Sequence, residues 1–122
     1  MSGTVFITNM NPEHDYTSAG KYGAIRPITS GNYAIFKTSR LVDEAVQALI
    51  ESDENDYLLV SGSSVVAAIC MAVWLAMHKK VNLLLHDRRQ TQYVPRTLLR
   101  SHVQLNIEKA RDKLAKRKEG LG

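Results

Sequence analysis

The pattern of apolar and polar positions predicts alternating strands and helices. Residues 4–9 (TVFITN) alternate and are rich in β-forming side chains, which favours a strand. Residues 57–61 (YLLVS) and 81–86 (VNLLLH) are short apolar runs, typical of strands buried on both faces. Between these two runs, the apolar stretch of residues 65–78 predicts a helix. Strand, helix and strand joined by short connections predict a pair of parallel strands.

This central helix is too short to cross a membrane. Its unbroken apolar part, residues 65–77, is thirteen residues long and makes a helix of about 20 Å, whereas a bilayer core requires about 20 residues. The preceding SGSS segment, Ser61–Ser64, interrupts the helix because glycine and serine favour turns. We therefore expect no membrane segment and a helix buried on every side.

Two further helices are expected, one before this unit in the sequence and one after it. In residues 39–52 an apolar face recurs with helical spacing, with Thr38 or Ser39 as the cap and Asp43 and Glu44 in the early turns. That face consists of Leu41, Val42, Ala45, Val46, Leu49 and Ile50. From about Val103 onward, a narrower apolar stripe predicts a terminal helix, and its members are Val103, Ile107, Ala110 and Leu114.

Two segments that contain proline predict edge strands. AIRPIT (24–29) is expected to be an edge strand or irregular, followed by a second extended piece, NYAIF (32–36). YVPRTL (93–98) is expected to return antiparallel after the polar turn DRRQTQ (87–92). The fourteen-residue polar segment 10–23 is unusually long for a plain connection, and such loops often bind ligands.

Together these elements predict one α/β domain over residues 1–122. We expect a small three-layer domain with a mainly parallel sheet, helices on both faces and a C-terminal amphipathic helix. The 44% hydrophobic content suits a globular protein with its own core. The single cysteine, Cys70, lies in the apolar stretch and is expected to be a buried thiol in a reducing compartment. Because the first residues lack the pattern of a secretory signal, we expect a cytoplasmic location.

Parallel strands bring their carboxyl ends to one edge of a sheet. Three polar segments follow the three best predicted strands: Asn9–Tyr16, Ser61–Ser64 and His86–Arg89. Open α/β sheets bind ligands beyond the carboxyl ends of their strands. The sequence therefore predicts a ligand site where these three segments meet.

The SGSS segment offers one way to hold an anion. Gly62 allows a sharp turn, and the amides of the following helix, with the hydroxyls of Ser61, Ser63 and Ser64, can bind phosphate. The alternative interpretation is an N-cap serine on a tight turn without a ligand. The segment lacks the lysine of a phosphate-binding P-loop.

The other two segments add charge to the predicted site. His86, Arg88 and Arg89 are suited to neutralising a phosphate, and His14 and Asp15 from the long loop would line the remainder. The alternatives are a solvated hairpin turn and ordinary polar loop residues. The favoured interpretation is a site for an anionic, nucleotide-like small molecule.

Enzymatic and metal chemistry have weaker support. Ser63, with His14 or His86 and Asp15 or Asp87, supplies the residue types of nucleophilic catalysis, but the G-x-S-x-G pattern is absent. Whether a reaction is catalysed stays open. Four dispersed histidines and one cysteine show no ligand spacing, so no metal site is predicted and no cofactor is assigned.

The net charge of +4 is unevenly distributed and supports a second hypothesis. Residues 1–86 carry 6 basic and 8 acidic side chains, and residues 87–122 carry 10 and 4. The basic C-terminal third therefore predicts a module that binds nucleic acid or a protein, although Tyr93 is its only aromatic side chain. Because a short chain has little material to cover an all-apolar helix, we also expect a homo-oligomer. The basic residues are Arg96, Arg100, Lys109, Arg111, Lys113, Lys116, Arg117 and Lys118.

The segments HDYTSAGKYG (14–23), YLLVSGSS (57–64), VNLLLHDRR (81–89) and YVPRTL (93–98) resemble those of small uncharacterised proteins of tailed bacteriophages. This resemblance implies a viral protein of Rossmann-like shape, present in the host-cell cytoplasm, and no particular reaction. More loosely, the strand, small-residue turn and alanine-rich helix are similar to nucleotide-sensing domains of CRISPR ancillary proteins. Too few of the motif residues of those domains are present to carry over a site. For a phage-encoded protein, we expect a host nucleotide or a host protein as the partner, and interference with a host pathway as the role.

Overall fold

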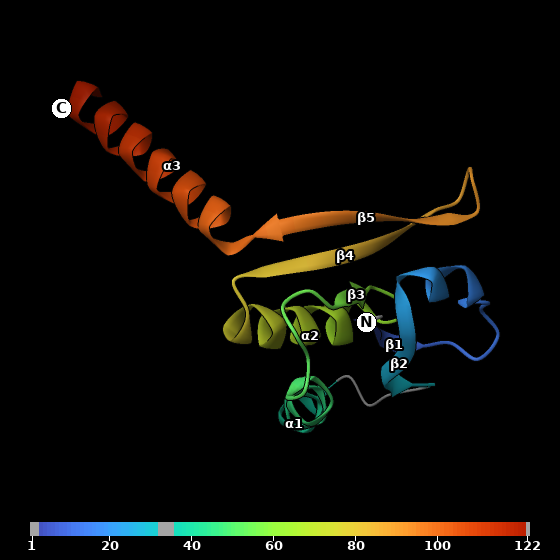
Figure 1. Ribbon diagram of the computed structural model, residues 1–122. Coiled ribbons are helices and arrows are strands. Elements are labelled where there is room, and N and C mark those ends of the chain that lie inside the picture. The colour runs from blue at the N-terminus through green and yellow to red at the C-terminus, as the bar shows by residue number, and fades with distance from the viewer. Residues whose placement is uncertain (1–2, 32–35, 122) are drawn as a thin grey trace.

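The computed structural model describes residues 3–31 and 36–121 (Figure 1). Its strands are β1 (Gly3–Met10), β2 (Gly23–Ser30), β3 (Tyr57–Leu59), β4 (Lys80–Asp87) and β5 (Gln92–Leu99). Its α-helices are α1 (Thr38–Leu49), α2 (Ser64–Met77) and α3 (Arg100–Leu121), and a 3-10 helix, η1 (Thr17–Tyr22), lies between β1 and β2.

The strands form one sheet in the order β2-β1-β3-β4-β5. Strands β1 to β4 run parallel, and β5 pairs antiparallel with β4. The predicted α/β fold class with a mainly parallel sheet is confirmed. From β1 the chain continues to β2 on one side of the sheet, and from β3 it continues to β4 on the other. The connections after β1 and β3 therefore lead toward opposite edges of the sheet, and α/β sheets commonly bind ligands where the strand order reverses in this way.

The two faces of the sheet are covered differently. Helices α1 and α2 cover one face, and Phe6, Leu58 and Trp74 are among the buried residues of that layer (Figure 1). On the other face, Tyr16 and Ala19 from the loop and η1 pack on strand residues. The third layer therefore consists of a short 3-10 helix within the long 10–23 segment.

Helix α1 begins differently from the sequence prediction. Its N-cap is Lys37, without a side-chain cap, and Thr38 and Ser39 belong to the helix itself. The expectation that Thr38 or Ser39 caps the helix is wrong. No acidic residue lies in its first turn, so Asp43 and Glu44 lie too far along the helix to stabilise its N-terminus strongly.

The predicted apolar face of α1 is only half buried. Leu41, Ala45 and Leu49 face the sheet and are buried. The adjacent stripe stays exposed, with exposed fractions of 40%, 36% and 63% for Val42, Val46 and Ile50. The sheet covers one stripe of the helix and leaves the second to solvent.

Helix α2 is also buried on one side only. Val66, Cys70 and Trp74 are buried, and the indole Nε1 of Trp74 donates to the Lys80 carbonyl at 2.9 Å. The outward positions Ala68, Ala72 and Ala76 are exposed. The expectation of burial on every side is wrong, because small alanines rather than a further element complete the outer surface.

The expected edge strands are confirmed. Strand β2, which contains Pro27, and strand β5, which contains Pro95, form the two edges of the sheet. Proline has no N–H to donate, and on an edge strand this missing donor can face solvent instead of a neighbouring strand. The predicted extended piece NYAIF lies, except for the exposed Phe36, outside the described residues.

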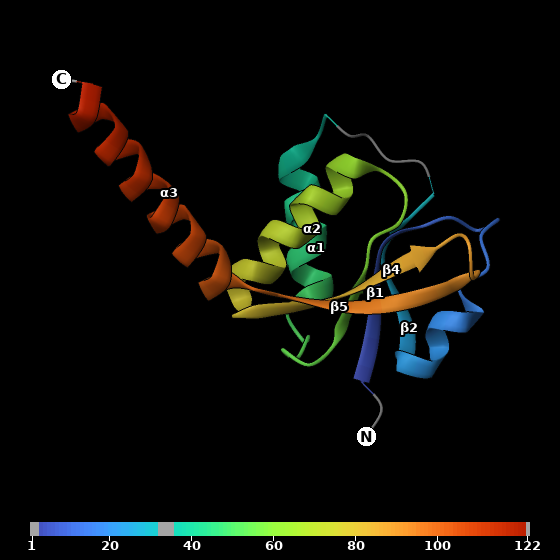
Figure 2. The same cartoon turned by 90° about the horizontal axis from the view of Figure 1, so that it is seen from above.

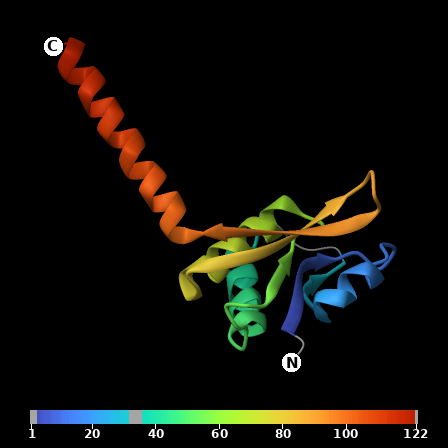
Figure 3. The ribbon, with the colours of Figure 1, turned by 45° about the horizontal axis from the view of Figure 1, so that its top comes forward.

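Helix α3 leaves the rest of the molecule. It starts at Arg100, directly after the last residue of β5, and its residues from Ser101 to Gly120 are exposed. Figures 2 and 3 show that it projects away from the sheet and the other helices. Among residues 3–31 and 36–121 there is no helix that is both long and apolar enough to span a bilayer.

Candidate anion-binding site

The three predicted polar segments meet at the carboxyl edge of the sheet. The hydroxyls of Tyr16 and Ser61 are 2.8 Å apart and join the loops after β1 and β3. The rings of His14 and His86 lie 5.6 Å apart and join the first loop to the end of β4. This convergence follows from the parallel direction of β1, β3 and β4.

The loops after β1 and β3 are held together by an internal network. The hydroxyl of Thr8 donates to the carbonyl of Ser61 at 2.8 Å and accepts from its amide at 2.9 Å. The Tyr16 hydroxyl also accepts from the amide of Asn11 at 2.9 Å. Ser61 therefore bonds within the protein through its backbone and its hydroxyl, and its position is structural.

Ser63 has the alternative role that the sequence left open. Its hydroxyl is the N-cap of α2 and accepts from the amide of Val66 at 3.5 Å. Ser64 is the first residue of the helix and is exposed. The SGSS segment is therefore a capped turn between a strand and a helix.

Gly62 lines a cavity of about 450 Å³ beside this turn. The remaining lining residues are Asn9, Asn11, Pro12, Glu13 and Gly31. None of these residues is basic, and the carboxylate of Glu13 opposes the entry of an anion. This cavity is polar but electrostatically unsuited to phosphate.

His14 and Asp15 make contacts within the protein. The Nε2 atom of His14 lies 2.9 Å from the hydroxyl of Tyr93, and its ring lies 4.6 Å from the ring of Tyr16. Asp15 Oδ1 accepts from the hydroxyl and the amide of Thr17 at the start of η1. These two bonds hold the pKa of Asp15 below its usual value. Neither residue lines the cavity beside Gly62.

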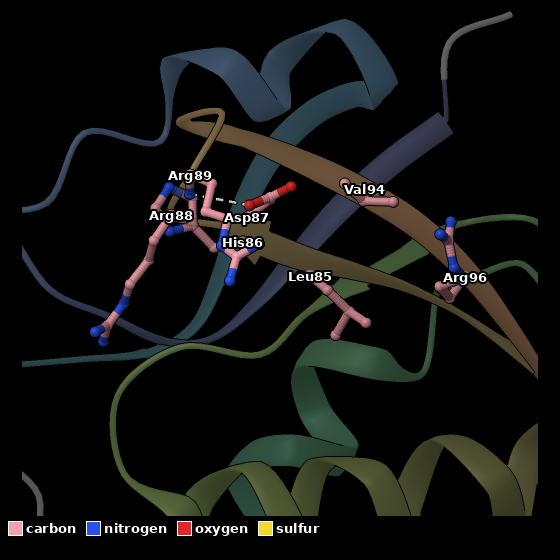
Figure 4. A pocket seen from close by; sticks show the side chains of 7 residues that line it. All are labelled: Leu85, His86, Asp87, Arg88, Arg89, Val94 and Arg96. Atoms are coloured by element: carbon pink, nitrogen blue, oxygen red, sulfur yellow. Dashed lines mark hydrogen bonds between the residues drawn. The ribbon is translucent and has the colours of Figure 1, made fainter.

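A second cavity, shallow and open to solvent, with a volume of about 460 Å³, lies at the turn between β4 and β5. It is lined by Leu85, His86, Asp87, Arg88, Arg89, Val94 and Arg96 (Figure 4). We call it the arginine cavity. In Figure 4 the side chains of Arg88 and Arg89 come from the turn, and Arg96 lies farther along β5 with Leu85 between the two ends.

The charge of the arginine cavity is strongly positive. It contains three arginines and one aspartate, and Asp87 Oδ1 accepts from the backbone amide of Arg89 at 3.0 Å. Within residues 3–31 and 36–121, Arg88, Arg89 and Arg96 form no salt bridge with an acidic side chain. Guanidinium groups without an acidic partner favour the binding of an external anion.

The structure divides the predicted site residues. His86, Arg88 and Arg89 line the arginine cavity, and Gly62 lines the neighbouring cavity. Ser61, Ser63, His14 and Asp15 make internal hydrogen bonds instead. The sequence interpretation placed Arg96 only in the basic C-terminal third, although it belongs to the arginine cavity.

The hydrogen bonds of three candidate catalytic residues lead to other partners. Ser63 bonds to Val66, His14 to Tyr93 and Asp15 to Thr17. In the described part of the chain, no group of three or more His, Cys, Asp or Glu side chains is arranged to hold a metal ion.

Residues 4–99 match the family model described as Phage Pam3 gp32-like protein. The chain belongs to this family. The matched region covers β1 to β5 and ends immediately before α3. Neither the curated proteins nor the solved structures include a match. The predicted relation to bacteriophage proteins is therefore confirmed at the level of the family.

Proposed function

We propose that this phage-family protein binds an anionic, nucleotide-like small molecule in the arginine cavity. The observation that carries this proposal is the group of three arginines around one cavity, without salt bridges among the described residues. Arginine binds phosphate through paired N–H donors in a fixed geometry. His86 also lines this cavity, and its ring lies 5.1 Å from the ring of Tyr93 and 5.6 Å from that of His14.

The lining of the cavity suits a ligand with a charged part and an apolar part. Leu85 pairs with Val94 across β4 and β5, and both line the cavity between its two charged ends. One charged end is Arg96, which pairs with Leu83, and the other is the turn after Asp87. Leu83 and Asp87 are four residues apart on β4, so about 13 Å separates the two ends along the strand. A nucleotide would place phosphate on Arg88 and Arg89 and its base on the exposed Leu85.

This proposal changes the roles first expected for several residues. Arg88, Arg89 and His86 remain ligand contacts, and Arg96 joins them. Ser61, Ser63, His14 and Asp15 instead shape the sheet edge through their internal hydrogen bonds. In an infected cell, such a protein would act in the host cytoplasm by sequestering a host nucleotide, which requires binding and no reaction.

A thermal-shift screen tests the proposal. Inorganic phosphate, nucleoside mono-, di- and triphosphates and cyclic nucleotides are each added to the full chain. A ligand at ~100-fold excess over its Kd adds about 2.7 kcal/mol of stability and raises Tm by several degrees. Arg88→Ala and Arg96→Ala should abolish most of this increase.

Arg40→Ala provides the matched control. Arg40 is an exposed arginine that bonds Glu44 on α1, so its removal changes the net charge equally without touching the cavity. It should retain the full increase in Tm. The proposal is wrong if no phosphate compound stabilises the chain, or if Arg40→Ala reduces the response as much as Arg88→Ala does.

A further inference from the structure

Helix α3 carries an apolar stripe with no partner in the described chain. Val103, Ile107, Ala110 and Leu114 recur at intervals of four, three and four residues, and all four are exposed. This spacing is that of the contact stripe in coiled coils. The helix has 22 residues, and most helices of proteins depend on packing against another element for their stability.

Helix α3 does not pack on the body of its own chain. Arg100 follows β5 without a loop, its amide donates to the Lys79 carbonyl at 2.9 Å, and its Nη1 donates to the Leu75 carbonyl at 2.8 Å. These bonds fix the start of the helix at the end of α2. From there it points into solvent in each view (Figures 2 and 3).

Helices α1 and α2 also carry exposed apolar positions. The two helices pack against each other, and their exposed residues include Val42, Val46 and Ile50 on α1, beside the exposed Asp43 and Gln47, and Ala68, Ala72 and Ala76 on α2. We call these apolar residues the α1–α2 face. Small side chains allow a third helix to approach closely, and α2 contains no charged residue.

The charges around the two surfaces are opposite. Residues 37–56, which contain α1 and the following loop, carry six acidic and two basic side chains, for a net charge of −4. Residues 100–121 carry seven basic and three acidic side chains, for a net charge of +4. By contrast, pairing of α3 with another α3 would bring Arg111, Lys113 and Lys118 beside like charges along the contact stripe.

We propose that the protein forms a reciprocal dimer in which α3 of each copy lies on the α1–α2 face of the other. A two-fold arrangement buries the apolar stripe of α3 and the α1–α2 face in both copies. It also places the basic α3 of one copy beside the acidic residues 37–56 of the other. Binding of α3 to nucleic acid would use its positive charge but would leave both apolar surfaces in water. The observations therefore favour a second copy of the chain over nucleic acid.

The oligomeric state of two matched variants tests the proposal. Ile107 and Leu105 are similarly exposed, at 44% and 48%, but lie two residues apart and hence on nearly opposite sides of α3. Sedimentation equilibrium should show a dimer for the wild type and for Leu105→Glu. Ile107→Glu and Val46→Glu should each raise the dimer dissociation constant roughly tenfold or more, because each places a carboxylate in the apolar contact.

Disulfide trapping identifies which surfaces meet. Ala72→Cys and Ala110→Cys are prepared separately in the full chain, mixed and oxidised. The proposal predicts a disulfide-linked dimer that contains one copy of each variant. The native Cys70 does not interfere, because it is buried.

Three results would overturn the reciprocal dimer. A wild-type chain that stays monomeric at all accessible concentrations excludes it. Crosslinking of Ala110→Cys to itself, without the partner variant, shows pairing of α3 with α3 instead. Salt-sensitive binding of nucleic acid by a monomer, lost when the basic residues of α3 are neutralised, assigns α3 to nucleic acid.

Discussion

Gly62 lies against the side chain of Asn9 so closely that a β-carbon at Gly62 would be 2.8 Å from Asn9 Nδ2. Asn9 lies at the end of β1, and Gly62 lies in the turn after β3. Their contact therefore joins the two loops at the point where the strand order changes direction. Asn9 is itself held, because its Oδ1 accepts from the Thr29 hydroxyl at 2.8 Å and its Nδ2 donates to the Gly31 carbonyl at 3.1 Å. It has little freedom to move aside.

Gly62→Ala should therefore lower the free energy of unfolding by more than the strain of a positive φ alone would. Gly62 has a φ of 77°, and Gly31, with a φ of 73° and open space around its α-carbon, is the matched control. We expect Gly31→Ala to lower the free energy of unfolding by about 1 kcal/mol and Gly62→Ala by about 2–3 kcal/mol. Urea denaturation measures both, and equal losses would show that the Asn9 contact is unimportant.

The hydroxyl of Tyr16 should contribute measurably to stability. Tyr16→Phe removes a group that bonds both the Asn11 amide and the Ser61 hydroxyl, so we expect a loss of about 1–2 kcal/mol. Tyr57→Phe serves as the control, because the Tyr57 hydroxyl makes no hydrogen bond within the described residues, and it should change stability by less than about 0.5 kcal/mol.

A double-mutant cycle separates the Tyr16–Ser61 bond from the other contacts of Tyr16. Tyr16→Phe and Ser61→Ala should show a coupling energy of about 0.5–1.5 kcal/mol in chemical denaturation. Purely additive losses would mean that the two hydroxyls do not bond in solution.

Cys70 should make the protein sensitive to alkali. Burial raises the pKa of its thiol from 9.0 to about 11, because the thiolate is disfavoured in the core. The folded state then retains a proton that the unfolded state loses, so stability is unaffected below about pH 9 and falls as the pH rises to about 11. A shift of this size corresponds to at most about 2.7 kcal/mol.

Cys70→Ala should reduce this alkaline loss, as measured by urea denaturation at pH 8, 9, 10 and 11. Burial also raises the pKa of Tyr93, so the free energy of unfolding of the variant should still fall somewhat as the pH rises. If the free energy of unfolding fell equally with pH in the variant and the wild type, the thiol would not stay protonated in the folded state.

The local elements of this fold could be predicted from sequence, but their arrangement could not. β4 and α2 follow directly from apolar runs of the appropriate length, and β5 follows from its proline and the polar turn before it. Strand order depends on pairing between distant segments, such as β1 with β3, which no local pattern encodes. The 3-10 helix η1 was missed because it is short and polar.

The candidate site could be predicted in position but only partly in composition. The polar segments after β1, β3 and β4 had to share an edge once these strands were parallel. Whether Ser63 caps a helix or contacts a ligand depends on side-chain direction, which the sequence left open. Arg96 enters the cavity only because the antiparallel register places it opposite Leu83, and that register becomes apparent in the structure alone.

A nucleotide titration followed by two-dimensional NMR of the uniformly labelled chain tests the central claim most directly, since it locates the ligand residue by residue. The account predicts saturable shifts of the backbone amides from Leu85 to Arg89 and from Val94 to Arg96, with small changes around Gly62 and along α3. Arg88→Ala should weaken the binding, and Arg40→Ala should not. No saturable shift with any phosphate compound, or shifts confined to α3, would contradict the account.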